Sequence, residues 1–282
     1  MLEPDAEQRD RRSLAETLRQ LRDAAGLSGE RLAVRTAMSQ SKISRIESGR
    51  IVPTVADTER IMRALDVPRE TREELLSLAR AANIEYTSLR SSARVGIWRR
   101  QAEIKSLVDS SSVVRQFLPA APSGLLQTRE YARAALTPGV EGRPARDVER
   151  AVRARLERQG ALNDESRRFR FLLTEQAVRT KRAEPAVMVD QLHHMIEVAN
   201  LRNVELAVLS DDALVRASPL NVFVVYDDRL VTAELFSGSV ALRDHRDVTY
   251  HLNLFAHFRE RALVGKEARQ LLVSIAEEYR GT

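Results

Sequence analysis

The first third of the chain alternates residues that begin helices with residues that end them, which restricts it to a series of short helices. Serine or threonine, whose side chain can cap a helix N-terminus, precedes four stretches with apolar residues at helical spacing. These cap candidates are Ser13, Ser28, Ser39 and Thr54. Glycine, which favours helix C-termini, follows two of the stretches at Gly26 and Gly49. The pattern predicts five helices within residues 13–83, the first opened by a capping box of Ser13 and Glu16.

Residues 28–50 have the arrangement of a helix-turn-helix, with a break at Thr36-Ala37-Met38 between two short helices. In the second helix the spacing of Ile43 and Ile46 turns both residues inward and leaves a polar outer face. The outward residues suited to hydrogen-bonding base edges are Gln40, Ser41, Ser44 and Arg45. The candidates for phosphate contacts are Ser39, at the amide-rich helix N-terminus, Lys42 and Arg50. A solvated face on a small helical bundle is the alternative interpretation.

Charge favours the DNA-binding interpretation. The chain has 45 Lys and Arg against 40 Asp and Glu, a net charge of only +5. Residues 1–100 hold 19 of the bases and 15 of the acids, so nearly all of the excess lies beside the predicted helices. A small excess on a small domain can still make one face strongly basic, which suits double-stranded DNA as a partner.

Composition excludes several classes of protein. The chain has no cysteine, which excludes disulfide scaffolds, zinc fingers and thiol nucleophiles. No apolar run approaches the ~18 residues of a membrane span, and the N-terminus lacks the apolar core of a signal peptide. We therefore expect a cytoplasmic protein without membrane contact.

Residues 14–65 resemble the Xre/Cro-type helix-turn-helix repressors through LRQLRDAAGLS at 18–28, LA at 32–33, SQSKISRIESG at 39–49 and the proline that follows. The resemblance implies a five-helix lambda-repressor-like domain in which Gln40, Ser41 and Arg45 read major-groove bases, with Ser44 as a further candidate. It also implies a structural ion pair between Arg22 and Glu47. Two positions depart from the family. Gly29 stands where a glutamine is common, and Ala37 stands where glycine is frequent, so a left-handed backbone there would be strained.

The remainder of the chain predicts a connector at residues 84–110 and an α+β domain at 111–282. Alternating or continuous apolar runs predict strands at 112–117, 168–174, 204–210, 220–226 and 230–236. Helical spacing predicts a helix that begins near Ile97, a turn followed by a helix within 123–136, and helices at about 145–160, 185–199, 243–262 and 266–279. Residues 227–229 are placed to form a hairpin turn between the last two strands.

Signatures of catalysis are missing from this second domain. It contains no phosphate loop, dinucleotide fingerprint, nucleophile elbow or zinc-protease motif. His193 with Glu197, and Asp190 with His194, lie one helical turn apart but lack a third ligand at metal-binding spacing. Glu175 follows a strand and is better explained as a first-turn acid that complements a helix dipole than as a catalytic group. We predict no catalytic residue, no metal and no cofactor.

A second resemblance covers residues 95–280. It is to the C-terminal domain of actinobacterial WhiJ-like and antitoxin-like regulators, and its motifs are GLLQTREYARA at 124–134, Arg155 with Arg158-Gln159, LLTEQAVR at 172–179 and VMVDQLHHMIE at 187–197. The sequence departs from that family at Ser123 and at Thr174, where proline-glycine and aspartate are usual. The resemblance implies a regulator, sometimes encoded beside a small partner protein.

Together these features predict a sequence-specific transcriptional regulator that binds an inverted repeat as a homodimer. The second domain would mediate dimerisation or the response to an effector or partner. The alternative is an antitoxin-like protein that binds a small partner protein and represses its own operon. An enzyme with a DNA-binding appendage, and a sensor of a small-molecule ligand, are further alternatives.

Overall fold

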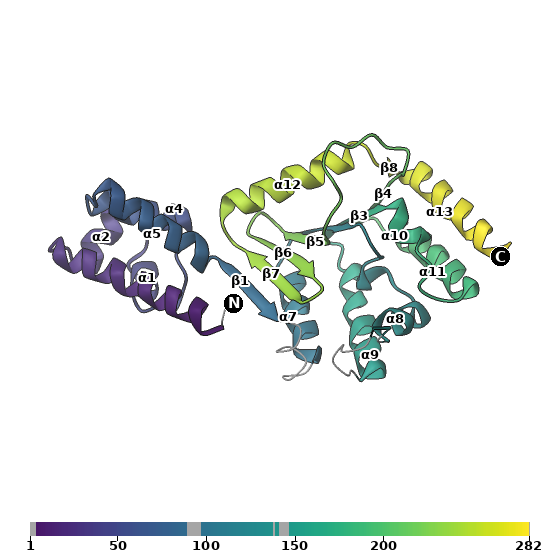
Figure 1. Cartoon of the computed structure of the whole chain (residues 1–282), viewed down its shortest axis with the longest axis horizontal. Coiled ribbons are helices and arrows are strands. Elements are labelled where there is room, and N and C mark those ends of the chain that lie inside the picture. The colour runs from purple at the N-terminus through teal and green to yellow at the C-terminus, as the bar shows by residue number, and fades with distance from the viewer. Residues whose placement is uncertain (1–3, 89–96, 138, 141–146, 282) are drawn as a thin grey trace. The chain divides into compact units, whose positions relative to one another are not determined.

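The chain forms two compact units in the computed structural model, which describes residues 4–88, 97–137, 139–140 and 147–281 (Figure 1). The first unit comprises Met1–Glu85 together with Ala241–Asp247, and the second comprises Tyr86–Val240 and Val248–Thr282. The predicted classes are confirmed, because the first unit is a bundle of five helices and the second combines a mixed sheet with helices.

All five predicted helices of the first unit are present. They are α1 (Pro4–Ala24), α2 (Gly29–Thr36), α3 (Gln40–Glu47), α4 (Val55–Ala64) and α5 (Arg69–Ala82). Ser28, Ser39 and Thr54 each accept a backbone amide at the start of a helix, as predicted. These caps set where α2, α3 and α4 begin.

The capping box predicted at Ser13 is wrong, because α1 begins nine residues earlier, at Pro4. Residues 4–12 contain no helix breaker after the proline, and proline at the first helical position already has the required φ. The helix therefore continues through Ser13. The capping box of this unit lies instead at Thr54 and Asp57, whose side chains and backbone amides bond reciprocally.

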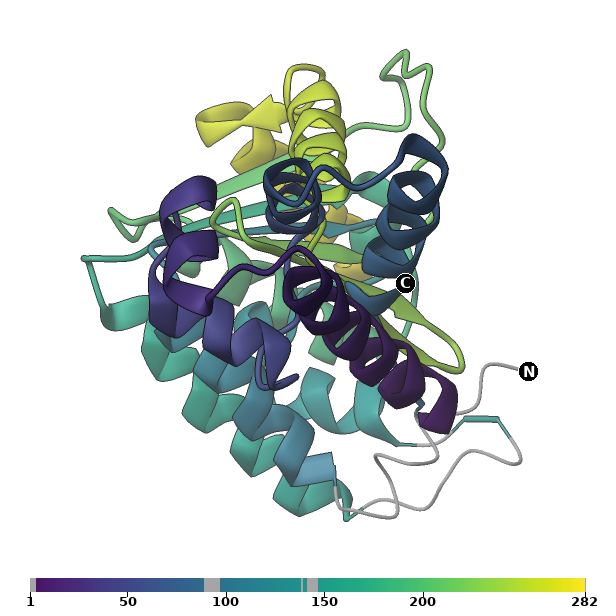
Figure 2. The same cartoon turned by 90° about the vertical axis from the view of Figure 1, so that its left-hand side faces the viewer.

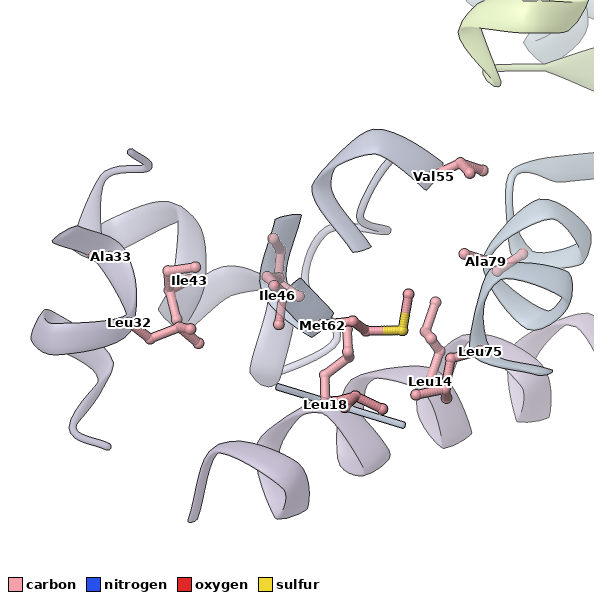
Figure 3. Packing of buried hydrophobic residues seen from close by; sticks show 13 residues of the cluster. Leu14, Leu18, Leu32, Ala33, Ile43, Ile46, Val55, Met62, Leu75 and Ala79 are labelled. Atoms are coloured by element: carbon pink, nitrogen blue, oxygen red, sulfur yellow. The ribbon is translucent and has the colours of Figure 1, made fainter. Parts of the chain in front are cut away.

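One apolar cluster holds the five helices together (Figure 3). Leu14 and Leu18 of α1 meet Met62 of α4 and Leu75 of α5, and Ile46 of α3 lies near Met62. These side chains are almost completely buried. Because each full burial of such a side chain contributes about 1.5–3 kcal/mol, the cluster stabilises helices that would be marginal alone.

The turn between α2 and α3 contains the strained residue that the sequence predicted. Ala37 has φ 52° and ψ 41°, the left-handed conformation. Its amide donates to the carbonyl of Val34 at 3.2 Å, and the amide of Met38 donates to that of Ala33 at 3.0 Å. These hydrogen bonds end α2 in the way that is usual when glycine follows a helix. Alanine at this position adds the steric cost of a Cβ atom.

Replacing Ala37 by Gly should therefore stabilise the first unit by about 0.5–1 kcal/mol, because relief of strain exceeds the entropy cost of glycine. The matched control is Ala81→Gly, at an exposed alanine in the last turn of α5, where the backbone is helical and unstrained. That control should destabilise the unit by about 1 kcal/mol. Amide hydrogen exchange of peptides from residues 29–64 measures both effects, and equal destabilisation by the two variants would contradict the prediction.

The second unit is built on an eight-stranded sheet in the order β1-β7-β6-β5-β2-β3-β4-β8. The strands are β1 (Ile84–Ser88), β2 (Val113–Leu118), β3 (Arg168–Thr174), β4 (Val204–Leu209), β5 (Phe223–Tyr226), β6 (Leu230–Leu235), β7 (Gly238–Leu242) and β8 (Leu263–Val264). Strands β2, β3 and β4 run parallel, whereas β5, β6 and β8 pair antiparallel to their neighbours. The five predicted strands are thus confirmed, including the β5–β6 hairpin.

Helices cover both faces of this sheet. They are α7 (Ile97–Asp109), α8 (Arg129–Leu136), α9 (Val148–Gln159), α10 (Glu175–Arg179), α11 (Pro185–Val198), α12 (His245–Arg259) and α13 (Gly265–Arg280). Figure 1 and Figure 2 show α12 on one face and α7, α8 and α9 on the other. Phe258 of α12 stacks on Phe117 of β2 with 4.6 Å between ring centroids.

Strands β1, β7 and β8 were not predicted from the sequence. The first of these lies in the segment expected to be a connector. Gly238 explains the tight approach of β7 to β1, since a Cβ atom there would lie 2.2 Å from the carbonyl oxygen of Thr87. The absence of a side chain at Gly238 is therefore required for this part of the sheet.

Candidate nucleic-acid interface

Helix α3 has the two faces that its spacing predicted. Ile43 and Ile46 are 1% and 0% exposed and point into the cluster of the five-helix unit (Figure 3). On the opposite side lie the four residues predicted to contact bases, and all of them are exposed: Gln40, Ser41, Ser44 and Arg45. The fold thus gathers these four side chains on one accessible helix face.

The N-terminal end of α3 is arranged around Ser39. Its hydroxyl accepts from the amide of Lys42 at 3.2 Å and lies 3.2 Å from the hydroxyl of Ser41. The helix dipole places partial positive charge at this end. Arg45 lies one turn further along, where its Nε donates to the carbonyl of Ser41 at 3.2 Å. That exposed contact leaves most of the donors of Arg45 available.

Arg50 follows the end of the helix. The chain turns there because Gly49 adopts φ +68°, and the amide of Arg50 donates to the carbonyl of Arg45 at 2.9 Å. The Arg50 side chain is exposed and makes no hydrogen bond or ion pair with the residues that the structure describes. Its place beyond the helix suits contact with a phosphate rather than with a base.

The predicted pair of Arg22 and Glu47 is present and joins α1 to the last residue of α3. Arg22 Nε donates to Glu47 Oε1 at 2.7 Å, and Nη2 donates to Oε2 at 3.0 Å. Arg22 Nη1 also donates to the carbonyl of Leu27 at 2.8 Å. Both charged side chains are only 13% exposed. The hydrogen bonding of Arg22 to the Glu47 carboxylate is the main cause of the raised pKa of Arg22, and the fork geometry fixes the direction of α3.

Lys42 occupies a different environment from the other predicted contacts. Its side chain is half-buried, and its ammonium lies 2.8–2.9 Å from both carboxylate oxygens of Asp57, the acidic residue of the capping box of α4. Arg60 also donates to Asp57 at 2.8 Å. Burial alone would raise the pKa of the Asp57 carboxyl, but the hydrogen bonds from Lys42 and Thr54 hold it below its ordinary value.

Sequence reasoning missed Asp57, although the Thr54-x-x-Asp57 spacing carried a detectable capping-box signal. The pairing of Asp57 with a lysine fifteen residues earlier carried no local signal, because it depends on how α3 and α4 pack. Arg31, exposed in the first turn of α2, was also missed as a basic residue of the helix-turn-helix.

In the second unit, Glu175 has a structural role. Its carboxylate accepts from Arg179 Nε at 2.5 Å, from the hydroxyl of Ser210 at 3.1 Å and from the amide of Asp211 at 3.1 Å. Burial favours a higher pKa for Glu175, yet these donors hold it below its ordinary value. A carboxylate that is satisfied in this way joins α10 to the end of β4.

The histidines do not form a metal site within the described ranges. Arg280 Nη2 lies 2.9 Å from His193 Nε2, and His194 Nδ1 lies 4.0 Å from Glu197. Burial lowers the pKa of His194. No group of three or more His, Asp and Glu side chains that could hold a metal ion occurs among the residues described.

The motif at 124–128, which carries the second resemblance, is held by a polar network. Gln127 accepts from Arg155 Nη1 at 2.6 Å, and Gln159 donates to the carbonyls of Gly124 and Gln127 at 3.0 and 2.7 Å. Gln191 donates to the carbonyl of Leu126 at 2.6 Å. These contacts fix the short 3₁₀ segment η1 (Gly124–Leu126) before α8 and give the motif a structural explanation.

The geometry of the first unit defines a helix-turn-helix domain, and a family model described as a helix-turn-helix domain matches residues 13–75. A second model, described as a domain of unknown function, DUF5753, matches residues 101–274. The chain therefore belongs to the DUF5753 family and carries an N-terminal helix-turn-helix domain. No curated protein matches the sequence. No helix in the described part of the chain is long and apolar enough to cross a bilayer.

Solved structures with distant similarity include TrmBL2, an archaeal chromatin protein whose structure is said to show a novel mode of DNA binding. TrmBL2 is 16% identical to this chain, with a TM-score of 0.34, and the match covers 73% of this chain and 66% of TrmBL2. This chain therefore spans just under two thirds of the length of TrmBL2. Nuc from Salmonella typhimurium, a phospholipase D family member, is 12% identical, with a TM-score of 0.34 over 64% of this chain and 95% of that one. NucT from Helicobacter pylori is 11% identical, with a TM-score of 0.36, and the match covers 64% of this chain and 98% of NucT. Similarity at this level says nothing about the function of this chain.

Replacing Glu47 by Ala should destabilise the first unit by about 2–3 kcal/mol, because the largely buried guanidinium of Arg22 loses two charge-assisted hydrogen bonds. It keeps the exposed carboxylate of Asp23, at 2.6 Å, and the carbonyl of Leu27. The control is Glu73→Ala, which removes an exposed i, i+4 pair with Arg69 and should cost less than about 0.5 kcal/mol. Hydrogen-exchange protection of residues 29–64 measures the loss of stability in each of the two variants. Equal protection in the two variants would show that the Arg22–Glu47 pair does not hold α3.

The lowered pKa of Asp57 predicts a loss of stability in acid. Because the folded pKa lies below the unfolded value of about 3.9, the stabilisation is complete above that value and is lost as the pH falls through the folded pKa. Asp57→Asn should cost about 2 kcal/mol at pH 7 and flatten this acid dependence. Hydrogen-exchange protection factors of residues 29–64, measured between pH 6 and pH 3 and corrected for the intrinsic exchange rate, test this acid dependence in both proteins. Glu74→Gln, at an exposed acid on α5, should keep the profile of the unmodified protein.

Proposed function

We propose that the protein is a sequence-specific DNA-binding transcriptional regulator whose α3 enters the major groove. The observation that carries this proposal is the exposed polar face of α3, formed by Gln40, Ser41, Ser44 and Arg45, over the buried Ile43 and Ile46. Second helices of helix-turn-helix domains read base edges from such a face. The match of residues 13–75 to a helix-turn-helix family supports the same assignment.

The proposal divides the predicted contacts by role. Gln40, Ser41, Ser44 and Arg45 contact base edges, whereas Ser39 and Arg50 contact phosphates at the two ends of α3. Lys42 is assigned a second role, because its pairing with Asp57 braces α3 against α4 and only part of its ammonium can face a phosphate. We further propose that the domain is of the Xre/Cro type and that the protein acts in the cytoplasm as a non-enzymatic regulator.

We propose a homodimer on an inverted repeat, because two recognition helices read twice as many bases as the single one that each chain supplies. Half-site centres should then lie about one helical turn, ~34 Å, apart or a multiple of that distance. The second unit is proposed to provide the dimer contact or the surface for an effector. Large apolar side chains that it exposes, Leu214, Leu220 and Phe236 among them, support a contact of this kind.

An antitoxin-like role is the second candidate, supported by the same exposed apolar side chains. Co-purification of a stoichiometric small protein encoded beside this chain would favour it. Selection of binding sites from random duplexes, followed by sedimentation of the complex, tests the main proposal. A symmetric site bound by two chains supports it, whereas the absence of any selected sequence would contradict it.

Arg45→Ala should reduce affinity for the selected site by about 1–3 kcal/mol and relax the preference at one base pair, if the guanidinium makes a bidentate base contact. Arg80→Ala, which removes an exposed arginine from α5, is the matched control and should leave binding unchanged. Fluorescence anisotropy with the selected duplex and its single-base variants measures both. Unaltered base preference in Arg45→Ala would show that α3 is misassigned.

Arg50→Ala should weaken all duplexes by a similar factor and make the slope of log affinity against log salt shallower by about one, because one phosphate contact is lost. The measurement is a salt titration with the selected and a scrambled duplex. A loss confined to the selected sequence would place Arg50 at a base instead.

A further inference from the structure

A cavity of about 300 Å³ in the second unit lies at the ends of β3 and β4, beside the first turn of α13. Four arginines line it: Arg168 and Arg170 from β3, Arg202 from the turn before β4, and Arg269 from α13. None of these four side chains makes a hydrogen bond or ion pair with the residues that the structure describes; Arg168 and Arg202 are exposed, and Arg170 and Arg269 are half-buried. The cavity therefore concentrates guanidinium groups that have no partner within this part of the chain.

The strand register places further positive charge beside these arginines. Arg170 is directly opposite Arg115 of β2, and Arg168 lies two residues before it on the same side of β3. Arg115 is partly buried, and among the residues that the structure describes its side chain donates only to the carbonyl of Asp227, at 3.3 Å. Burial is the main cause of the lowered pKa of Arg115, and the positive charge of Arg170 is the second cause. Like charges on adjacent strands are destabilising unless a counter-charge lies near them.

The carboxylate that lines the cavity does not supply this counter-charge. Glu205 of β4 is opposite Arg170 in the register. However, its Oε1 accepts from Arg259 Nε of α12 at 2.6 Å, which offsets the charge of Glu205 with a fifth arginine. The lining therefore keeps a clear excess of positive charge.

The first turn of α13 adds backbone donors at the same place. Gly265 and Ala268 line the cavity, and the N-cap residue Val264 has no side chain that can accept a hydrogen bond. The amides of this turn are thus not capped by a side chain, and the helix dipole favours an anion there. Apolar side chains, Phe169 and Leu206, complete the lining and leave room for an organic group.

We propose that this cavity binds a small organic phosphate, with the arginines of β3, α13 and the turn before β4 holding the phosphate oxygens. Guanidinium forks match phosphate geometry and form charge-assisted hydrogen bonds. The volume is at the lower end for ligand pockets and suits a ligand of about the size of a nucleoside monophosphate or a sugar phosphate. This site lies in the second unit and does not depend on the proposed DNA contact.

The test uses the full chain and isothermal titration calorimetry with three probes: inorganic pyrophosphate, adenosine monophosphate and, as the uncharged comparison, adenosine. We expect saturable binding of the two phosphates, no binding of adenosine, and weaker binding at higher salt. Both phosphates should raise the melting temperature, because they bind the folded state.

Arg202→Ala and Arg269→Ala should each weaken binding of both phosphates by at least about tenfold, as expected when a charge-assisted contact is removed. Arg170→Ala should do the same without lowering the melting temperature of the unliganded protein, since it relieves the repulsion with Arg115. The matched controls are Arg153→Ala and Arg216→Ala, exposed arginines that do not line the cavity. They should bind within twofold of the unmodified protein.

The absence of saturable phosphate binding would overturn the proposal, as would equal losses in the cavity and control variants. Weakened binding of the selected DNA duplex by Arg202→Ala or Arg269→Ala, with no binding of small phosphates, would also overturn it and assign the arginines to a DNA-contacting face. Failure of the DNA experiments alone would leave the phosphate measurements unaffected, so the two proposals are tested separately.

Discussion

Helix α3 is only eight residues long, and a helix of this length is not stable in water by itself. Its existence depends on burying Ile43 and Ile46 in the cluster contributed by the other helices of the first unit. The ion pair of Arg22 with Glu47 and the pair of Lys42 with Asp57 then hold its end and its start. The polar face that can meet DNA is therefore rigid because the opposite face and the flanking charges are anchored.

Charge is distributed differently in the two units. In the first unit the partly buried bases Arg22 and Lys42 have acidic partners, and the exposed Arg45 and Arg50 have no acidic partner among the described residues. In the second unit Arg168, Arg170, Arg202 and Arg269 gather around one cavity, and none of them pairs with an acidic residue in the described ranges. A net charge of +5 conceals this arrangement, because local placement rather than the total decides which surface attracts an anion.

Much of the fold followed from local patterns. The caps at Ser28, Ser39 and Thr54, and the alternation at 168–174, each led to the element that the structure contains. The failures have physical causes. The first helix extends past Ser13 because no residue between Pro4 and Ser13 ends it. The short strands β7 and β8 depend on neighbours distant in sequence, so their own few residues carry little signal.

By itself, the sequence determined the class of the first unit, the face of α3 that points outward, and the order of strands β2 to β6 and of the longer helices in the second. Those features depend on side-chain periodicity and capping, which act over a few residues. Only the tertiary structure decided that Lys42 pairs with Asp57, and that Arg168, Arg170, Arg202 and Arg269 line one cavity. Such contacts join residues far apart in the chain. They are set by helix packing and strand register, which no local pattern specifies.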